Sequence, residues 1–365
     1  MTLHIYFGRR FLVAFLGVFF ALSTMLALID MLEQVRRFDS DTVSFGAIVT
    51  LTLLNVPESI YRILPLVTIL ATLALFLALS RSSELVIARA SGRSALTSIA
   101  APVLVAIAIG GGAVAIFNPI VAATSKQYDT LANRYLQTAT SVLSISTEGL
   151  WLRQGGPEGQ TVIRASRANL DGTQLFDTTF LSFAPGGLPV DRIEAARATL
   201  TPGAWVLEDA KKWPLSGADN PELQAEEIPD LKIVTDLTRN QIIDSFGTPS
   251  AIPIWELPGF IEQLEKAGFS ARQHRVWFQM ELAMPLLLGA MVLVAAGFTL
   301  RPARFGQTGL MVVLALTLGF SLYFMRNFAQ ILGENGQIPV LLAAWGPPAA
   351  AVLLPLGLLL HLEDG

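Results

Sequence analysis

The chain has 365 residues, of which 52% are hydrophobic and 15% are charged, and its net charge is −4. Soluble domains carry about 25% charged residues, so this composition indicates a polytopic membrane protein. The acidic balance provides no positive field for nucleic acid. The absence of cysteine excludes disulfides, thiol catalysis and cysteine-ligated zinc. The three histidines (His4, His274 and His361) lie in separate segments, so no histidine metal site is expected.

Six apolar stretches are long enough to cross about 30 Å of hydrocarbon, for which a helix needs about 20 residues. Arg9 and Arg10 before the first stretch resemble a twin-arginine export signal. However, the apolar run that follows is too long for a signal, and no small-x-small cleavage site follows it, so we interpret it as a membrane helix. The six expected spans are about Phe11–Leu32, Ile60–Leu79, Leu96–Phe117, Val276–Leu300, Leu310–Leu332 and Ile338–Leu360.

The arginines of the short loops predict the orientation, because cytoplasmic loops are rich in lysine and arginine. If the helices alternate, the cytoplasmic side receives both termini and Arg9, Arg10, Arg81, Arg89, Arg93, Arg301 and Arg304. The long polar interval between spans three and four then lies in the periplasm. Arg36 and Arg37 fall on the periplasmic side, against the rule, which suggests another purpose for them.

The polar interval predicts a helix followed by an all-β domain. A helical continuation of span three runs to about Thr140, and short alternating segments with turn signals then extend over 142–237. Short strands at this spacing are typical of an antiparallel sandwich or an open roll, and an amphipathic helix at 256–266 leads back to the membrane. Four aromatic residues either line the interior of the roll or simply pack in the core: Trp151, Phe180, Phe183 and Trp205.

No catalytic motif is apparent in the sequence. It contains no nucleotide-binding G-x-x-x-x-G-K-[ST] motif, no Ser/His/Asp set and no paired carboxylates. The glycines at 110–112 lie inside a predicted span, where they favour close helix packing over phosphate binding. Any work that the chain performs therefore draws its energy from a partner or from an ion gradient.

The segment Arg81–Gly92 between spans two and three is too short to cross the membrane and predicts a short cytoplasmic helix. Ser82 suits the N-cap, Glu84 falls in the first turn, where the helix dipole favours an anion, and Gly92 ends the helix. Residues 85–88 offer an apolar surface. The helix is either a plain connector or a docking element for a cytoplasmic partner, with Glu84 as the charged anchor.

Within this segment Ser83–Gly92, SELVIARASG, resembles the S-E-L-x-x-x-x-A-S-G stretch of the lipopolysaccharide export permeases, the LptF/LptG (YjgP/YjgQ) family. The arrangement of three spans, a soluble domain and three spans is similar to that family over the whole chain. So are Gly149-Leu-Trp-Leu-Arg153 and the region of Pro285. The Ala-Ser-Gly ending is closer to the LptG branch.

The resemblance implies an α-helical polytopic membrane protein with six transmembrane helices and an inserted all-β, jelly-roll-like periplasmic domain. Its parts would be residues 1–118 with a coupling helix at 81–92, the β domain with flanking helices at 119–271, and the last three spans at 272–365. The chain would be the non-catalytic permease of an ABC transporter in a Gram-negative inner membrane, without cofactor or metal. It would extract lipopolysaccharide and pass it toward the outer membrane, with LptF, an LptB ATPase dimer, LptC and LptA as partners.

The resemblance and the residues together suggest two kinds of site. The ATPase-coupling residues would be Glu84, Ser83, Leu85 and Arg89. The residues that bind lipid phosphate would be Arg36, Arg37, Arg275 and Arg326, since arginine binds phosphate bidentately and an ionisable residue inside a span is a functional candidate. Alternatively, Arg36 and Arg37 bind ordinary anionic lipid, and Arg326 snorkels or is paired structurally.

Two positions depart from the family's pattern. Asp30 and Glu281 stand where related permeases often carry basic residues, so no phosphate-binding role is transferred to either. We expect each to pair with a partner's arginine, with Arg36 or with Arg326. Two other functions stay open: an ion-driven secondary transporter, which would need charges and broken helices near the midplane, and a membrane-anchored envelope assembly factor.

Overall fold

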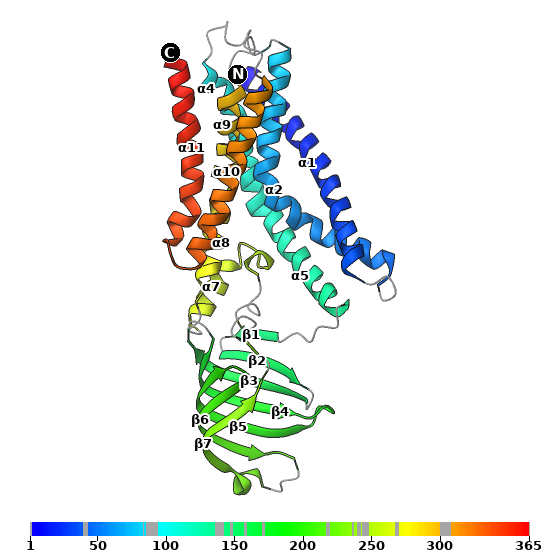
Figure 1. The fold of residues 1–365 in the computed structure, drawn as a ribbon, viewed down its shortest axis with the longest axis vertical. Helices are drawn as coiled ribbons and strands as arrows, with labels where there is room; N and C mark the ends of the chain where they lie inside the picture. Colours follow the sequence, from blue (N-terminus) through cyan, green and yellow to red (C-terminus); the bar gives the residue numbers. More distant parts are fainter. Residues whose placement is uncertain are drawn as a thin grey trace. The chain divides into compact units, whose positions relative to one another are not determined.

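The computed structural model describes two compact units of the chain (Figure 1). The helical unit comprises Met1–Leu136, Ser250–Trp255 and Arg272–Gly365, and the β unit comprises Gln137–Pro249 and Glu256–Ala271. The residues described are 2–38, 43–82, 84, 94–135, 142–146, 149–156, 159–169, 172–216, 220–235, 237–238, 242, 248–266, 270–299 and 308–364.

All six predicted spans are helical, and most are longer than predicted. In chain order the helical unit contains α1 (Thr2–Arg37), α2 (Phe45–Arg81), α4 (Ala95–Gly112), a π-helical turn (Ala113–Phe117), α5 (Asn118–Tyr135), α8 (Arg272–Leu282), α9 (Met284–Thr299), α10 (Thr308–Glu334) and α11 (Val340–Asp364). Five helices in the described part are long and apolar enough to cross a membrane. The pair α8 and α9, bent by 51°, makes a sixth if it is one span.

The bend between α8 and α9 lies where the sequence places Pro285. Proline lacks a backbone N–H and has a fixed φ, so it fits the first turn of a helix but interrupts a continuing one. It is the second residue of α9, two residues after Ala283, where α8 and α9 separate. By contrast, Pro347 and Pro348 lie within α11 and do not divide it.

The centre of the helical unit is α9, which packs against α2, α4, α10 and α11. Most of its residues are buried. The glycines of α4 explain part of this closeness. A Cβ added to Gly110 would lie 2.6 Å from the Cα of Pro285, so only glycine permits the observed approach. This confirms close packing at Gly110, whereas Gly111 and Gly112 have no such neighbour.

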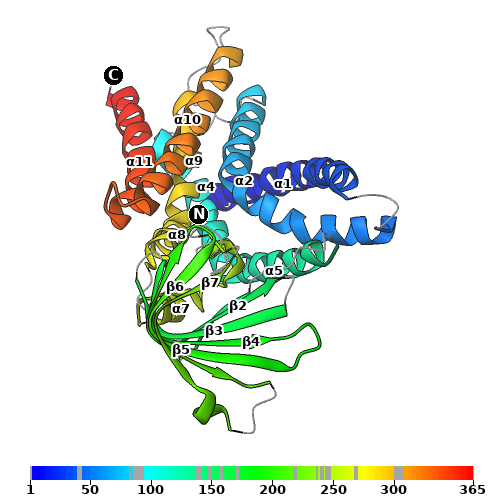
Figure 2. The same ribbon diagram turned by 60° about the horizontal axis from the view of Figure 1, so that its bottom comes forward.

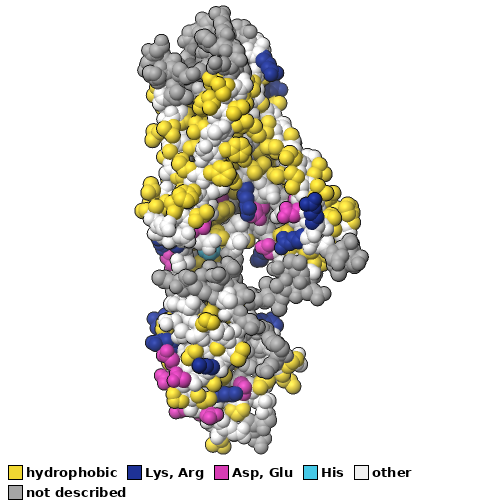
Figure 3. All heavy atoms as spheres, in the orientation of Figure 1, with side chains coloured by type: hydrophobic (Ala, Val, Ile, Leu, Met, Phe, Trp, Pro, Cys, Tyr) yellow, Lys and Arg dark blue, Asp and Glu magenta, His cyan; other side chains and the backbone are white. Residues whose placement is uncertain are grey.

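The first helix is the least buried span. In the most apolar 18-residue segment of α1, only 6% of the residues are buried, compared with 61% in the corresponding segment of α2. Hydrophobic side chains cover most of the face of the helical unit seen in Figure 3, and charged side chains gather toward its ends. In an aqueous protein such a surface would be unfavourable, but it is the surface that a bilayer or a partner helix covers.

The β unit is built on one antiparallel sheet in which the strands follow the order of the chain, β1 to β7. A single curved layer (Figure 2) corresponds to the open roll and not to the sandwich. The strands are β1 (Val142–Ser146), β2 (Gly149–Gly156), β3 (Gly159–Ala168), β4 (Gln174–Phe183), β5 (Pro189–Thr201), β6 (Ala204–Pro214) and β7 (Glu226–Val234). A helix, α7 (Leu257–Lys266), follows the sheet.

The alternation of buried and exposed residues breaks along one line across the sheet. In four strands the buried positions advance by three residues instead of two, from Ala165 to Ala168, Leu175 to Thr178, Ala195 to Ala198 and Leu207 to Ala210. Asp177 and Asp209 lie in these steps with φ of 50° and 52°. A residue in the left-handed conformation allows two successive side chains to point away from the inner face, and it bends the strand at that point. The line therefore accounts for part of the curvature of the roll.

The core of the β unit lies on the inner face of the sheet. Trp205 and Phe180 are fully buried there and their rings meet edge to face at 6.3 Å, as expected for core residues. Phe183 is half-buried and Trp151 is 36% exposed, so Trp151 is not a core residue. The predicted amphipathic helix is α7, and its Leu264 belongs to the same core cluster.

The left-handed aspartates give a first testable prediction. We expect Asp177→Val to destabilise the β unit by about 1–2 kcal/mol relative to Asp177→Gly, because a β-branched residue is strained at positive φ and glycine is not. The difference is measured by titrating the full chain in detergent with urea. At each urea concentration, the resistance of the β unit to protease reports how much of it is still folded. Asp230→Val is the matched control, since Asp230 lies exposed in β7 at a negative φ. Equal stability of the two Asp177 variants would contradict the role assigned to this residue.

Candidate functional site

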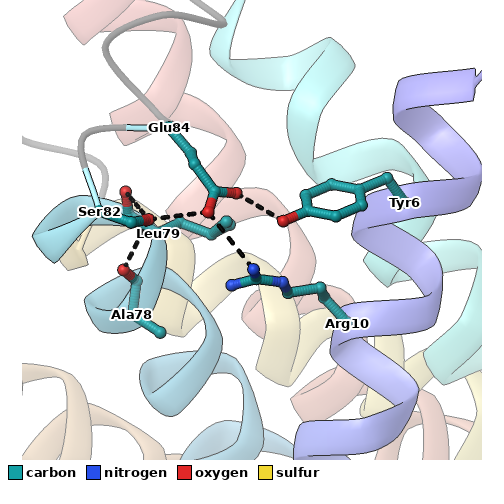
Figure 4. Close-up of polar contacts among 6 residues, drawn as sticks. All are labelled: Tyr6, Arg10, Ala78, Leu79, Ser82 and Glu84. Atoms are coloured by element: carbon teal, nitrogen blue, oxygen red, sulfur yellow. Dashed lines mark hydrogen bonds and ion pairs between the residues drawn. The ribbon is translucent and has the colours of Figure 1, made fainter.

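The ends of α1 and α2 meet at Glu84, just beyond α2 (Figure 4). Tyr6 of α1 donates a hydrogen bond from its hydroxyl to Glu84 Oε2 at 2.8 Å, and Arg10 forms an ion pair with Glu84 Oε1 at 3.3 Å. Tyr6 and Arg10 are four residues apart, so they project from the same face of α1. The Arg10 guanidinium also lies over the Tyr6 ring at 5.1 Å. One carboxylate is thus held by two side chains of α1.

The carboxylate is also tied to the end of α2. Ser82 is the C-cap of α2, and its backbone N–H bonds to the carbonyl of Ala78. Its hydroxyl lies 3.0 Å from Glu84 Oε1 and 3.1 Å from the Ala78 carbonyl oxygen. The sequence predicted Ser82 as the start of the next helix, whereas in the structure it ends α2.

The environment of Glu84 favours its charged form. The hydrogen bond from Tyr6 lowers the pKa of Glu84 most, and the hydrogen bond from Ser82 and the charge of Arg10 act in the same direction. The side chain remains 29% exposed. Glu84 is therefore an accessible, ionised carboxylate in a fixed position, as an anchor for a cationic partner requires.

The other predicted coupling residues, Ser83, Leu85 and Arg89, lie outside the described residues, as does most of the Arg81–Gly92 segment. The sequence did not indicate that Tyr6 neighbours Glu84. The available signal was the spacing of Tyr6 and Arg10 on one helix face at the predicted cytoplasmic end of span one.

At the other end of α1 the predicted lipid residues Arg36 and Arg37 are exposed in the last turn. Arg37 donates a hydrogen bond to the hydroxyl of Tyr128 on α5 at 3.2 Å, and Gln34 donates one to the same oxygen at 3.0 Å. The hydrogen bond to Tyr128 orients Arg37. Both guanidinium groups are exposed to solvent, so keeping them charged requires no desolvation. The pair can therefore present positive charge to an anion.

Asp30 is buried one turn before Gln34. Its Oδ1 accepts hydrogen bonds from Asn55 Nδ2 of α2 at 2.6 Å and from Gln34 Nε2 at 3.4 Å. Within the described residues, its other oxygen, Oδ2, has no hydrogen-bond partner. Asp30 therefore joins α1 to α2 through an amide and not through Arg36, one of the partners that the sequence suggested.

Arg326 of α10 is buried and interacts electrostatically with Glu281 of α8 and with Tyr61 of α2. Glu281 is fully buried and accepts a hydrogen bond from the Tyr61 hydroxyl and another from Asn118 Nδ2 at 3.3 Å. Asn118 in turn accepts a bond from the backbone N–H of Ile254 at 2.9 Å. The charge of Arg326 thus acts on a polar cluster that joins α2, α5 and α8, and its predicted role in binding lipid stays a prediction.

The fourth predicted lipid residue, Arg275, is exposed on α8. The neighbouring Arg272 has a structural role that the sequence did not indicate. It donates hydrogen bonds to the carbonyls of Gly333 and Ile338, at 2.6 and 2.7 Å, and so fixes α8 to the connection between α10 and α11. Across the described part of the chain, no group of three or more His, Asp or Glu residues is placed to hold a metal ion.

Comparison with known proteins agrees with this arrangement. The family model described as lipopolysaccharide export system permease LptF/LptG matches residues 5–361. The LptG permease of Escherichia coli K12 is 24% identical over 372 residues, which cover 98% of this chain and 97% of that protein. LptG of Haemophilus influenzae is 23% identical over 354 residues, 94% of this chain and 93% of that protein. With several apolar helices in a full-length match, the chain is a multi-pass inner-membrane protein, and it belongs to the LptF/LptG family of lipopolysaccharide export permeases.

Proposed function

We propose that the chain is the transmembrane subunit of an ATP-driven transporter that extracts lipopolysaccharide from the inner membrane. It passes the lipid to a periplasmic bridge that leads to the outer membrane. The observation that supports this most is the position of Glu84, an ionised and accessible carboxylate fixed between the ends of two membrane helices. An energy-providing subunit can bind there, and the chain itself has no nucleotide motif.

The proposed partners follow from the family. A cytoplasmic LptB dimer hydrolyses ATP, the paralogue LptF completes the membrane part, LptC joins it, and LptA accepts the lipid from the β unit. The termini and Glu84 then face the cytoplasm and the β unit faces the periplasm. In the helical unit, the N-terminus of α1, the Arg81 end of α2 and the C-terminal end of α11 lie at one end (Figure 1), as this orientation requires.

Two groups of residues are proposed to act. Glu84, Ser83, Leu85 and Arg89 form the ATPase-coupling segment. Arg36, Arg37, Arg275 and Arg326 provide positive charge along the lipid path. Arg36 and Arg37 have the strongest support, because both are exposed and Arg37 is oriented by Tyr128. The contribution of Arg326 is indirect, since its charge interacts with Glu281 in the interior.

Purification of the full chain from membranes in mild detergent tests the proposal. We expect a soluble ATPase, a paralogous permease and lipopolysaccharide to copurify, each identified by its mass. Gradient-dependent uptake of a solute by the chain alone in liposomes would instead identify an ion-driven transporter. Copurification of envelope proteins without an ATPase would identify an assembly factor.

A charge reversal tests the lipid path. We expect Arg36→Glu with Arg37→Glu to reduce photocrosslinking of lipopolysaccharide to the outer half of α1 by about tenfold, because two phosphate-binding cations become two repulsive carboxylates. Arg36→Lys with Arg37→Lys keeps the charge and is the matched control, for which we expect most of the crosslinking to remain. Unchanged crosslinking in the double glutamate variant would remove both arginines from the lipid path.

A further inference from the structure

The Glu84 carboxylate can accept further hydrogen bonds from a partner while it keeps its contacts with Tyr6 and Arg10 of α1. Among the described residues, its Oε2 accepts a hydrogen bond from Tyr6 alone, and its Oε1 faces Ser82 and Arg10. A carboxylate offers about four lone-pair sites, so a cation that approaches from solvent can add to these contacts. The exposed fraction of the side chain, 29%, leaves that approach open. Whatever binds Glu84 thereby becomes connected to Tyr6 and Arg10.

The helix that receives this connection, α1, packs on α2 and α4, and toward its far end it is tied by Asp30 to α2 and by Gln34 to α5. Phe7, Phe11 and Phe15 recur every four residues and are buried. Many of the other apolar side chains of α1 are exposed, including Val13 at 64% and Phe20 at 63%, while some, such as Phe19, are half-buried. In its most apolar 18-residue segment, only 6% of α1 is buried, compared with 61% of α2, and most residues of α9 are buried. Because α1 has the smaller packed surface, it can move relative to its neighbours more readily than α2 or α9.

We propose that Tyr6 and Arg10 are positioning residues of the ATPase-coupling site. Together with Glu84 they form a clasp, defined by these three side chains, that holds the carboxylate in place and makes α1 follow the docked segment. This rests on the proposed function, in which an ATPase subunit docks at Glu84. It adds a role for a helix that the coupling segment itself does not include.

The geometry of α1 gives the clasp a consequence at the other end. The helix runs unbroken over 36 residues, a length of about 54 Å at 1.5 Å per residue. Tyr6 and Arg10 lie in its first turns, and Arg36 and Arg37 lie in its last. A displacement at the clasp is therefore passed along one rigid element to the two arginines proposed to contact lipid phosphate. Nucleotide-driven motion would in this way alter the lipid site without a separate signal.

The assembled transporter in liposomes tests the clasp through two separate readouts, the amount of bound ATPase subunit and the lipopolysaccharide transferred per ATP hydrolysed. We expect Tyr6→Phe and Arg10→Ala to keep the ATPase bound but to lower transfer per ATP by about three- to tenfold, because each removes a charge-assisted contact to Glu84. Arg10→Lys, which keeps the ion pair, should restore most of the transfer.

Arg9→Ala is the matched control, since it removes the same charge from the next position of α1, which has no contact with Glu84. A drop in Arg9→Ala equal to that in Arg10→Ala, or unchanged transfer per ATP in Tyr6→Phe and Arg10→Ala, would overturn the clasp. Loss of the ATPase from these two variants would also contradict it, because docking and transmission would then not be separate.

A second measurement keeps the clasp testable even if no ATPase docks at Glu84. In the full chain in detergent, the losses of thermal midpoint caused by Tyr6→Phe and by Glu84→Ala should be non-additive, since the two side chains share one hydrogen bond that either substitution removes. Additive losses would show that the clasp is absent. If the losses are non-additive but Glu84→Ala still binds the ATPase normally, the proposed docking site fails and the clasp is only a structural contact.

Discussion

Replacement of Glu84 by alanine is expected to remove the ATPase subunit from the purified transporter while the chain remains in the membrane. The carboxylate is ionised, accessible and fixed by Tyr6, Arg10 and Ser82, so its loss deletes an anchor and does not expose an apolar core. Loss of a charge-assisted contact of this kind costs about ten- to a hundredfold in affinity. Titration of the purified ATPase subunit against the chain in detergent measures the change.

Glu33→Ala is a suitable control, because Glu33 is an exposed carboxylate on α1 near the opposite end. Glu84→Gln separates charge from shape, and we expect it to behave as the alanine variant does. The contacts of Glu84 lower its pKa below the ordinary value of 4.5, so a contribution that depends on its charge is present above that value and is lost as the pH falls through the lowered pKa. Docking through Glu84 should thus be constant around neutral pH. Normal affinity in Glu84→Ala would refute the docking site.

The apolar spans could be predicted from the sequence because the bilayer sets a simple requirement of about 20 apolar residues. The ends of the helices could not. Span one was expected at Phe11–Leu32, but α1 extends over Thr2–Arg37, since helical hydrogen bonds continue past the hydrocarbon into polar flanks. Strands in the polar interval were likewise predicted from alternation. The left-handed Asp177 and Asp209 that break this alternation had no signal beyond the residue type.

The polar contacts of the site depend on residues far apart in the chain. Tyr6 and Glu84 are separated by 78 positions, and Tyr61 and Glu281 by 220. Residue types alone do not specify such pairs, because helix packing decides which faces meet. The sequence did identify Glu281, like Asp30, as a departure from the family's pattern. It could not show that Glu281 accepts hydrogen bonds from Tyr61 and Asn118, which makes it a structural centre of the helical unit.

The close approach of α4 to α9 predicts a large effect from a single methyl group. In Gly110→Ala the new Cβ would lie 2.6 Å from the Cα of Pro285, a backbone atom that cannot move aside as a side chain can. We expect this overpacking to cost about 1–3 kcal/mol and to lower the thermal midpoint of the full chain in detergent. Higher helix propensity offsets it by at most about 1 kcal/mol.

Gly111→Ala is a matched control on the same helix, because nothing lies within 4 Å of the added Cβ and the propensity gain is the same. The difference between the two variants therefore isolates the contact with Pro285. Since Pro285 lies in the first turn of α9, just after the bend that separates α9 from α8, we expect a shift there also to displace Glu281, four residues earlier. Lipid transfer should consequently fall in Gly110→Ala even at temperatures where the protein stays folded. Equal thermal midpoints for the two variants would mean that α4 and α9 can separate at no cost, and the approach of Gly110 to Pro285 would then not hold the centre of the helical unit together.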